Sequence, residues 1–140
     1  MIQLILHLFG DYVTQSDWMA QNKTKSTWAA FCHALVYSLP FALIASLPAW
    51  LVIFSTHLLI DRYHVARFVV YLKNIIFSPA GCLWWYSTEV RRTAMDKLHW
   101  CDCSGTGYHK DAPPWLAVWL LIAADNTLHL AINYASIRWL

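Results

Sequence analysis

Three pairs of histidine and aspartate at four-residue spacing stand out in this sequence of 140 residues. The pairs are His7 with Asp11, His57 with Asp61, and Asp125 with His129 in the reverse order. Residues four apart lie on one face of an α-helix, so each pair would point its two side chains in the same direction. Random placement of the same residues would give only about 0.7 such pairs in a chain of this length. The pattern therefore indicates a common chemical role for the three pairs.

Metal binding is the chemistry that these residue types favour. Imidazole nitrogen and carboxylate oxygen together suit zinc, manganese or iron, whereas calcium and magnesium sites are built from oxygen. His33 stands alone in an apolar stretch and adds a further donor. We predict seven ligands: His7, Asp11, His33, His57, Asp61, Asp125 and His129. Seven donors exceed the needs of one four-coordinate zinc ion, so the sequence predicts two ions, with zinc ahead of manganese or iron.

The three aspartates are the predicted catalytic residues, because carboxylates can bridge or coordinate a pair of ions. Other polar residues extend the same helical faces. His64 follows Asp61 by one turn, so it either adds a ligand or lies at the level of the lipid headgroups. Asn126 and Asn133 would make either hydrogen bonds to ligands or ordinary packing hydrogen bonds. The predicted substrate-binding residues are Gln15, Lys23 and Arg62. Of these, Lys23 and Arg62, together with Lys25, could bind an anionic headgroup, whereas Gln15 has the same two alternatives as the asparagines.

Two cysteines and two histidines in the 73–112 region invite a second metal hypothesis. They are His99, Cys101, Cys103 and His109. A Cys-x-Cys pair does not have the usual spacing of a zinc knuckle, so we predict a plain loop there.

The composition is typical of a membrane protein. Hydrophobic residues make up 59% of the chain and charged residues 13%, against about 25% charged residues in ordinary soluble domains. Nine tryptophans and seven tyrosines suit the two membrane interfaces. The alternative is a very hydrophobic subunit of a soluble complex. A formal charge of only +2, without a basic stripe, argues against a nucleic-acid partner.

The hydropathy pattern predicts an all-α membrane bundle in a single domain, 1–140. About four transmembrane helices are expected, at 1–16, 27–46, 49–72 and 115–138, and the first of them is short. Pro48 suits the first turn of a new helix, so a break is placed at Ser46, while Pro40 is expected to kink the helix before it. Residues 73–112 are predicted as a loop or re-entrant insert, followed by a helix that Asp111 caps.

The distribution of lysine and arginine predicts the orientation of such a bundle. Nearly all of them fall in the 17–26 and 62–112 segments. The positive-inside rule places both segments in the cytoplasm and both termini outside, in a bacterial inner membrane.

The motifs also resemble a known family. The stretch from His7 to Met19, followed by Asn22-Lys23, His33 and His57-x-x-x-Asp61, resembles domain of unknown function 3307, a family of small integral-membrane proteins of bacteria and phages. The closing Asp125-Asn-Thr-Leu-His129 is similar to a later motif of that family. The resemblance implies a membrane location but no activity. The His/Asp pattern is also similar, at a lower level, to membrane-bound metal-dependent hydrolases.

Together these features predict a membrane-embedded metal-dependent hydrolase that acts on a lipid or lipid-linked phosphoester. The alternative is a non-enzymatic membrane protein, either conducting metal ions or protons or serving as a structural subunit, in which the buried pairs bind ions or pack helices. A di-iron oxidase ranks lower, because such enzymes are richer in histidine. The sequence leaves the substrate and the oligomeric state open.

Overall fold

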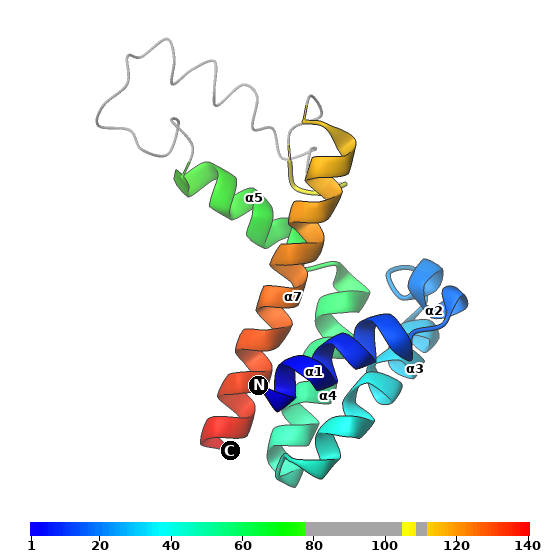
Figure 1. The fold of residues 1–140 in the computed structure, drawn as a ribbon. Coiled ribbons are helices and arrows are strands. Elements are labelled where there is room, and N and C mark those ends of the chain that lie inside the picture. Colours follow the sequence, from blue (N-terminus) through cyan, green and yellow to red (C-terminus); the bar gives the residue numbers. More distant parts are fainter. Residues whose placement is uncertain (78–104, 109–111) are drawn as a thin grey trace. The chain divides into compact units, whose positions relative to one another are not determined.

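Every regular element in the described part of the chain is a helix, which confirms the all-α prediction. The computed structural model describes residues 1–77, 105–108 and 112–140. The elements, shown in Figure 1, are α1 (Ile2–Leu8), the π-helix η1 (Phe9–Val13), α2 (Asp17–Asn22), α3 (Thr27–Ser38), the 3-10 helix η2 (Leu39–Leu43), α4 (Leu47–Tyr63), α5 (Ala66–Phe77) and α7 (Pro114–Trp139). The chain divides into two compact units: unit 1 is Met1–Val65 with Asn126–Leu140, and unit 2 is Ala66–Asp125.

Helices α3 and α4 form the hairpin that the sequence predicts. Ser46 caps α4 by accepting a hydrogen bond from the Ala49 N–H at 3.3 Å, and Pro48 lies in the first turn. Three contacts then step in opposite directions along the two helices: Trp50 with Ser38, His57 with His33, and Arg62 with Thr27. The helices are therefore antiparallel, and His33 faces His57 near the middle of both.

Two predicted helices end earlier than expected. Pro40 lacks an N–H and crowds the preceding turn, so α3 ends at Ser38 and the tighter η2 continues to Leu43. The prediction of one helix over 49–72 is wrong. Two helices, α4 and α5, occupy this stretch, because His64 adopts the left-handed conformation with φ 53° and ψ 48° and ends α4. The Val65 N–H donates to the Ile60 carbonyl oxygen at 3.0 Å, as in a Schellman helix end.

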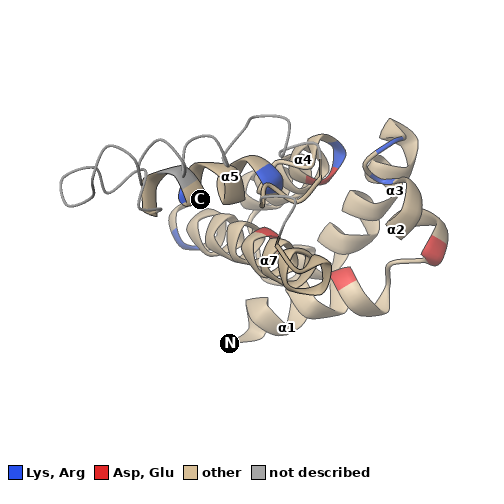
Figure 2. Ribbon diagram, turned by 90° about the horizontal axis from the view of Figure 1, so that it is seen from above, with Lys and Arg blue, Asp and Glu red and all other residues tan. Residues whose placement is uncertain are grey.

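The prediction of about four transmembrane helices is wrong. Among the described residues, only α7, with 26 residues, is long and apolar enough to cross a membrane. The apolar segments Ile2–Val13 and Thr27–Leu43 are shorter than 18 residues, because a polar turn ends the first and Pro40 disrupts the second. The predicted orientation in the membrane depended on four spans and therefore has no support. Figure 2 shows that charged residues are nevertheless few along these helices.

The ionisable side chains of α3 and of the middle of α4 lie on the same helix faces as the hydrophobic core of unit 1. On α3 the fully buried side chains recur from Ala30 through Ala34 to Tyr37, and His33 lies among them at 1% exposure. On α4 the buried face runs through Ile53, His57, Ile60 and Asp61. Helix periodicity therefore aims His33 and His57 into the interior rather than at the surface.

Unit 2 contains α5, residues 105–108 and the first half of α7. Gly107 has φ +79°, and a Cβ there would collide with the Arg67 carbonyl oxygen, so only glycine fits this turn against α5. The Asn74 side-chain amide donates to the Gly107 carbonyl oxygen at 3.1 Å. The first part of the predicted 73–112 insert, up to Phe77, belongs to α5 and is helical. Most of its remaining residues, including Asp111 and the Cys101–Cys103 pair with its two histidines, lie outside the described part.

Candidate metal centre

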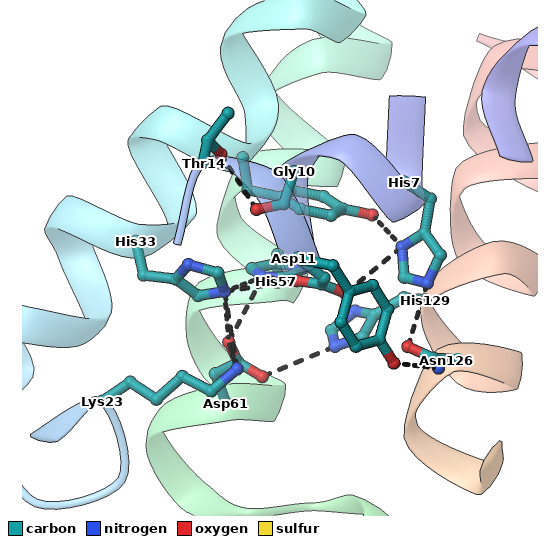
Figure 3. A network of polar contacts seen from close by, with 12 residues as sticks. His7, Gly10, Asp11, Thr14, Lys23, His33, His57, Asp61, Asn126 and His129 are labelled. Carbon is teal, nitrogen blue, oxygen red and sulfur yellow. Dashed lines mark hydrogen bonds and ion pairs between the residues drawn. The ribbon is translucent and has the colours of Figure 1, made fainter. Parts of the chain in front are cut away.

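Three donor atoms from α3 and α4 form a tight triangle in unit 1 (Figure 3). His33 Nε2 lies 3.0 Å from His57 Nε2 and 3.1 Å from Asp61 Oδ2. The third side, between His57 Nε2 and Asp61 Oδ2, measures 3.2 Å. Two ligands of one metal ion at about 2.1 Å are separated by about 3.0 Å in an octahedral arrangement and about 3.4 Å in a tetrahedral one. The triangle therefore has the dimensions of a two-histidine, one-carboxylate metal site.

Asp11 and His129 extend the triangle on either side. Asp11 Oδ1 lies 3.3 Å from His33 Nε2 and 3.6 Å from His57 Nε2. His129 Nε2, from α7, lies 3.5 Å from Asp61 Oδ1. Two buried groups could accordingly hold an ion: Asp11 with His33 and His57, and His57 with Asp61 and His129. We refer to these five residues as the His/Asp cluster, and it confirms that the predicted side chains can form a metal site.

The carboxylates of the cluster have close neighbours but few hydrogen bonds. Asp11 Oδ1 and Asp61 Oδ2 are both buried and accept no hydrogen bond of standard geometry from a described residue, although Lys23 Nζ forms an ion pair with Asp61 Oδ2 at 3.1 Å. The two Nε2 atoms of His33 and His57 face each other and the same carboxylate oxygens, and at most one proton fits between a pair of nitrogens. Two buried carboxylates carry more negative charge than one ammonium group offsets, and a bound divalent cation would neutralise both of them.

A π-helical turn brings Asp11 into this position. The Thr14 N–H donates to the Phe9 carbonyl oxygen at 3.1 Å, five residues back, and the Thr14 hydroxyl donates to the Gly10 carbonyl oxygen at 2.9 Å. Short π-helical turns are rare and frequently occur at functional sites. A Cβ at Gly10 would lie 2.5 Å from Tyr37 Cδ2. Glycine therefore permits the close approach of η1 to α3 that places Asp11 beside His33.

Tyr37 fixes the orientation of His57. The two rings are stacked with centroids 3.6 Å apart and an interplanar angle of 15°. The Tyr37 hydroxyl accepts a hydrogen bond from the Asn133 side-chain amide at 2.7 Å and lies 2.8 Å from His7 Nδ1. The only sign of this role in the sequence is the position of Tyr37, four residues after His33 on the same helical face. Gly10 was likewise missed, although it precedes Asp11 directly.

His7 lies beside the cluster, with both of its ring nitrogens in contact with other side chains. The Asn126 side-chain amide donates to the Tyr12 hydroxyl at 2.8 Å, which leaves its oxygen, 3.1 Å from His7 Nε2, as an acceptor. His7 Nε2 is then the protonated nitrogen, and Nδ1 can accept from the Tyr37 hydroxyl. His7 Nδ1 lies 3.5 Å from Asp11 Oδ2. Asn126 and Asn133 thus contact His7 and Tyr37, two residues outside both metal-binding groups.

Two of the predicted substrate-binding residues have defined positions. Lys23 Nζ lies 3.1 Å from Asp61 Oδ2 and 3.5 Å from His33 Nε2. Arg62 donates to the Thr27 hydroxyl at 3.1 Å and to the Thr24 carbonyl oxygen at 2.7 Å. Arg62 therefore holds the turn between α2 and α3, which carries Lys23, against the end of α4.

The charges in the cluster suit metal coordination. Burial lowers the pKa of His57 to about 4, so its imidazole is neutral at pH 7. Burial alone would raise the pKa of Asp61, but His57, His129 and His33 hold it well below its ordinary value. In the same way His33, His57 and His7 outweigh burial and lower the pKa of Asp11. Ionised carboxylates and neutral imidazoles are the forms that bind metal. His33 differs, because Asp11 and Asp61 outweigh burial and raise its pKa.

The remaining predicted residues lie outside the two metal-binding groups. Asp125 belongs to unit 2 and is half-buried on α7, so its role as a ligand stays a prediction. The Gln15 side-chain oxygen is buried and accepts no hydrogen bond from a described residue. His64 forms the C-terminal cap of α4, where the sequence predicted a helix that continues to residue 72.

Comparison with known proteins identifies the family and nothing further. No curated protein and no solved structure matches the chain. The similarity to membrane-bound metal-dependent hydrolases therefore has no support from these comparisons. One family model, described as "Protein of unknown function (DUF3307)", matches residues 1–77. These residues hold Asp11, His33, His57 and Asp61, and the chain belongs to the DUF3307 family.

Proposed function

We propose that the His/Asp cluster binds a divalent transition-metal ion, preferentially zinc, and that the protein is a metal-dependent hydrolase. The observation that carries the proposal is the triangle of His33, His57 and Asp61, whose donor atoms are separated by 3.0–3.2 Å. Two imidazoles with one or two carboxylates suit zinc, manganese and iron. A bound ion of this kind polarises water and the bond to be cleaved, which is the chemistry of hydrolysis.

One ion is the occupancy that the distances favour. The two groups share His57, and one ring nitrogen coordinates one ion. If His57 Nε2 serves the ion held by His33, only Asp61 and His129 remain for a second ion. Asp61 could then bridge two ions, with Oδ2 toward His33 and Oδ1 toward His129. A second, weaker ion would need a further ligand, and Asp125 stays the sequence's candidate for it.

A membrane is the proposed location, and a lipid or lipid-linked phosphoester is the proposed substrate. α7 is the candidate span, and large apolar side chains of unit 1 are widely exposed. They include Ile2, Ile5, Val13, Trp28, Leu43 and Leu47, each more than half exposed. Such a surface suits contact with hydrocarbon better than contact with water.

A structural metal site is the second candidate, because the cluster is deeply buried. The side chains of His33 and His57 are each 1% exposed and that of Asp61 is 3% exposed. A catalytic ion keeps a coordination position open to substrate, whereas a structural ion is closed. Asp11 and Lys23, at 10% and 20% side-chain exposure, mark the side from which a substrate would reach the ion.

Metal content is the first test. We expect the full chain, purified in mild detergent, to retain about one zinc equivalent, and Asp61→Asn to lose at least roughly 100-fold in zinc affinity because the central carboxylate becomes neutral. Asp17→Asn, the same change on the exposed face of α2, should retain the ion. A wild-type protein with less than about 0.1 equivalent after zinc supplementation would refute the metal centre.

Hydrolysis is the second test, and it separates the two candidates. A panel of phospholipids and lipid-linked phosphates is incubated with the zinc-loaded wild type, with the chelated protein and with Asp61→Asn. Turnover that disappears with the ion supports the hydrolase. A protein that holds zinc tightly, loses thermal stability on chelation and cleaves nothing would leave the structural site as the function.

A further inference from the structure

We propose that the ammonium group of Lys23 is the built-in counter-cation of the His/Asp cluster, which a metal ion displaces and which then pairs with a phosphate group at the ion. This inference rests on the metal centre and the phosphoester substrate proposed above, and it assigns the residue that would hold the phosphate group. Figure 3 shows Lys23 reaching the cluster beside Asp61 and His33, from a segment that supplies none of the predicted ligands.

The contacts of Lys23 coincide with those that an ion would use. Its Nζ approaches Asp61 Oδ2 to 3.1 Å and His33 Nε2 to 3.5 Å, and these two atoms form one side of the central triangle. A carboxylate oxygen can accept two partners, but an imidazole nitrogen has a single lone pair. His33 Nε2 can therefore accept a hydrogen bond from Lys23 or coordinate an ion, and not both. Repulsion between ammonium and ion acts in the same direction.

The charge balance then favours an anion. Asp11 and Asp61 together carry two negative charges, which a divalent ion neutralises. Lys23 adds a positive charge on the edge of this neutral centre, where its side chain is 20% exposed while that of Asp61 is only 3% exposed. A compact ammonium beside a divalent ion is a common arrangement for holding a phosphate, which offers several charged oxygens.

The backbone of this turn keeps Lys23 within reach in both states. Lys23 ends α2, where its N–H donates to the Met19 carbonyl oxygen at 2.9 Å, and Arg62 holds the next residue, Thr24, against α4. Displacement of the ammonium therefore requires only a change of side-chain rotamer. Lys25, two residues further along the same turn, is exposed and provides a matched control for removal of a charge.

Zinc affinity tests the competition. Full-length wild type, Lys23→Met and Lys25→Met are titrated with zinc against a chelator of known affinity. We expect Lys23→Met to bind zinc roughly tenfold more tightly than the wild type, since a competitor is removed, and Lys25→Met to change less than about twofold. In the metal-free state Lys23→Met should melt at a lower temperature, because Asp61 loses its cation, and zinc should abolish this difference. Equal or weaker zinc binding by Lys23→Met would overturn the competition.

Phosphate binding tests the second half. With all three proteins zinc-loaded, inorganic phosphate should bind Lys23→Met roughly tenfold more weakly than the wild type, and Lys23→Arg should restore most of the loss. Competition by a soluble phosphomonoester or by vesicles carrying the same headgroup then distinguishes a soluble source of phosphate from a lipid. Equal phosphate binding by Lys23→Met and wild type would overturn this half.

These outcomes separate the inference from the metal centre. Zinc uptake by the wild type with no effect of Lys23→Met overturns only the role of Lys23. If neither protein binds zinc, the metal centre and the role of Lys23 both fail.

Discussion

Tyr37 contributes a ring and a hydroxyl to different parts of unit 1. The ring stacks on His57, and the hydroxyl contacts Asn133 and His7. We expect Tyr37→Phe to keep the stack but to leave the buried Asn133 amide without its acceptor, at a cost of about 2 kcal/mol in unfolding free energy. Tyr12→Phe makes the same change on a ring that is 57% exposed and should cost less than about 1 kcal/mol. Denaturant unfolding of the two metal-free variants checks this, and equal losses would contradict it.

The buried imidazole of His57 makes the metal-free protein sensitive to acid. Because burial lowers its folded pKa to about 4, His57 stays neutral while the unfolded chain takes up a proton below about pH 6.5. The contribution of His57 is therefore complete above pH 6.5 and falls by an amount on the order of 3 kcal/mol as the pH approaches 4. His33 acts in the opposite sense, since its folded pKa is raised.

Comparison of slopes isolates the effect of His57 from that of its neighbours. Unfolding free energy is measured between pH 8 and pH 5 for the metal-free wild type and for His57→Gln. We expect a shallower dependence on pH in the variant, whatever its absolute stability. Identical slopes would show that His57 does not titrate as its burial requires.

At the scale of residues, the spacing rules could identify the ligands but not their neighbours. Asp61 follows His57 by four residues, and both point into the cluster. His7 obeys the same spacing with Asp11, yet its two nitrogens contact Asn126 and Tyr37 instead of joining either group. Spacing fixes the face of a helix, whereas the partner across the interface depends on how helices pack. Tyr37 could not be singled out for that reason.

At the scale of elements, η1 is the feature most sensitive to a single atom. The Tyr37 ring is fully buried and cannot move away from a methyl group placed 2.5 Å from its Cδ2. We expect Gly10→Ala to destabilise the protein by about 2 kcal/mol or more and to displace Asp11, which lowers zinc affinity.

A second glycine provides the control. A Cβ at Gly105 would meet no atom within 4 Å, so Gly105→Ala should leave zinc affinity unchanged. Thermal melting and zinc titration of both variants check the prediction. Normal zinc binding by Gly10→Ala would show that the contact between η1 and α3 does not position Asp11.

The helix boundaries show where the sequence-based predictions agree with the structure and where they differ from it. Ser46 and Pro48 mark the start of α4 because capping and proline act within a single turn. The end of α4 has no such sign, since His64 takes the left-handed conformation that glycine normally supplies. The number of spans was overestimated for a related reason: apolar content alone does not distinguish a helix of 17 residues, such as α4, from one long enough to cross a membrane.

At the scale of the whole molecule, α7 should decide whether the protein resides in a membrane. An arginine inside its apolar stretch costs about 3 kcal/mol on insertion, which corresponds to roughly 100-fold in partitioning. We expect Ile122→Arg to shift the protein out of the carbonate-resistant membrane fraction. Trp139→Arg, at the end of the helix, should remain in it because a terminal arginine can reach the interface. Equal fractionation of the two variants would argue against α7 as the membrane anchor.

The order in which the cluster residues occur along the chain has a consequence for biosynthesis. Asp11, His33, His57 and Asp61 all precede the point at which the chain leaves unit 1, and His129 follows only after unit 2. A ribosome therefore releases the first metal-binding group complete, well before it makes the last residue of the cluster. If the cluster binds an ion as proposed, the nascent chain can capture it early, and the C-terminal part of α7 then completes the cluster around an ion already in place.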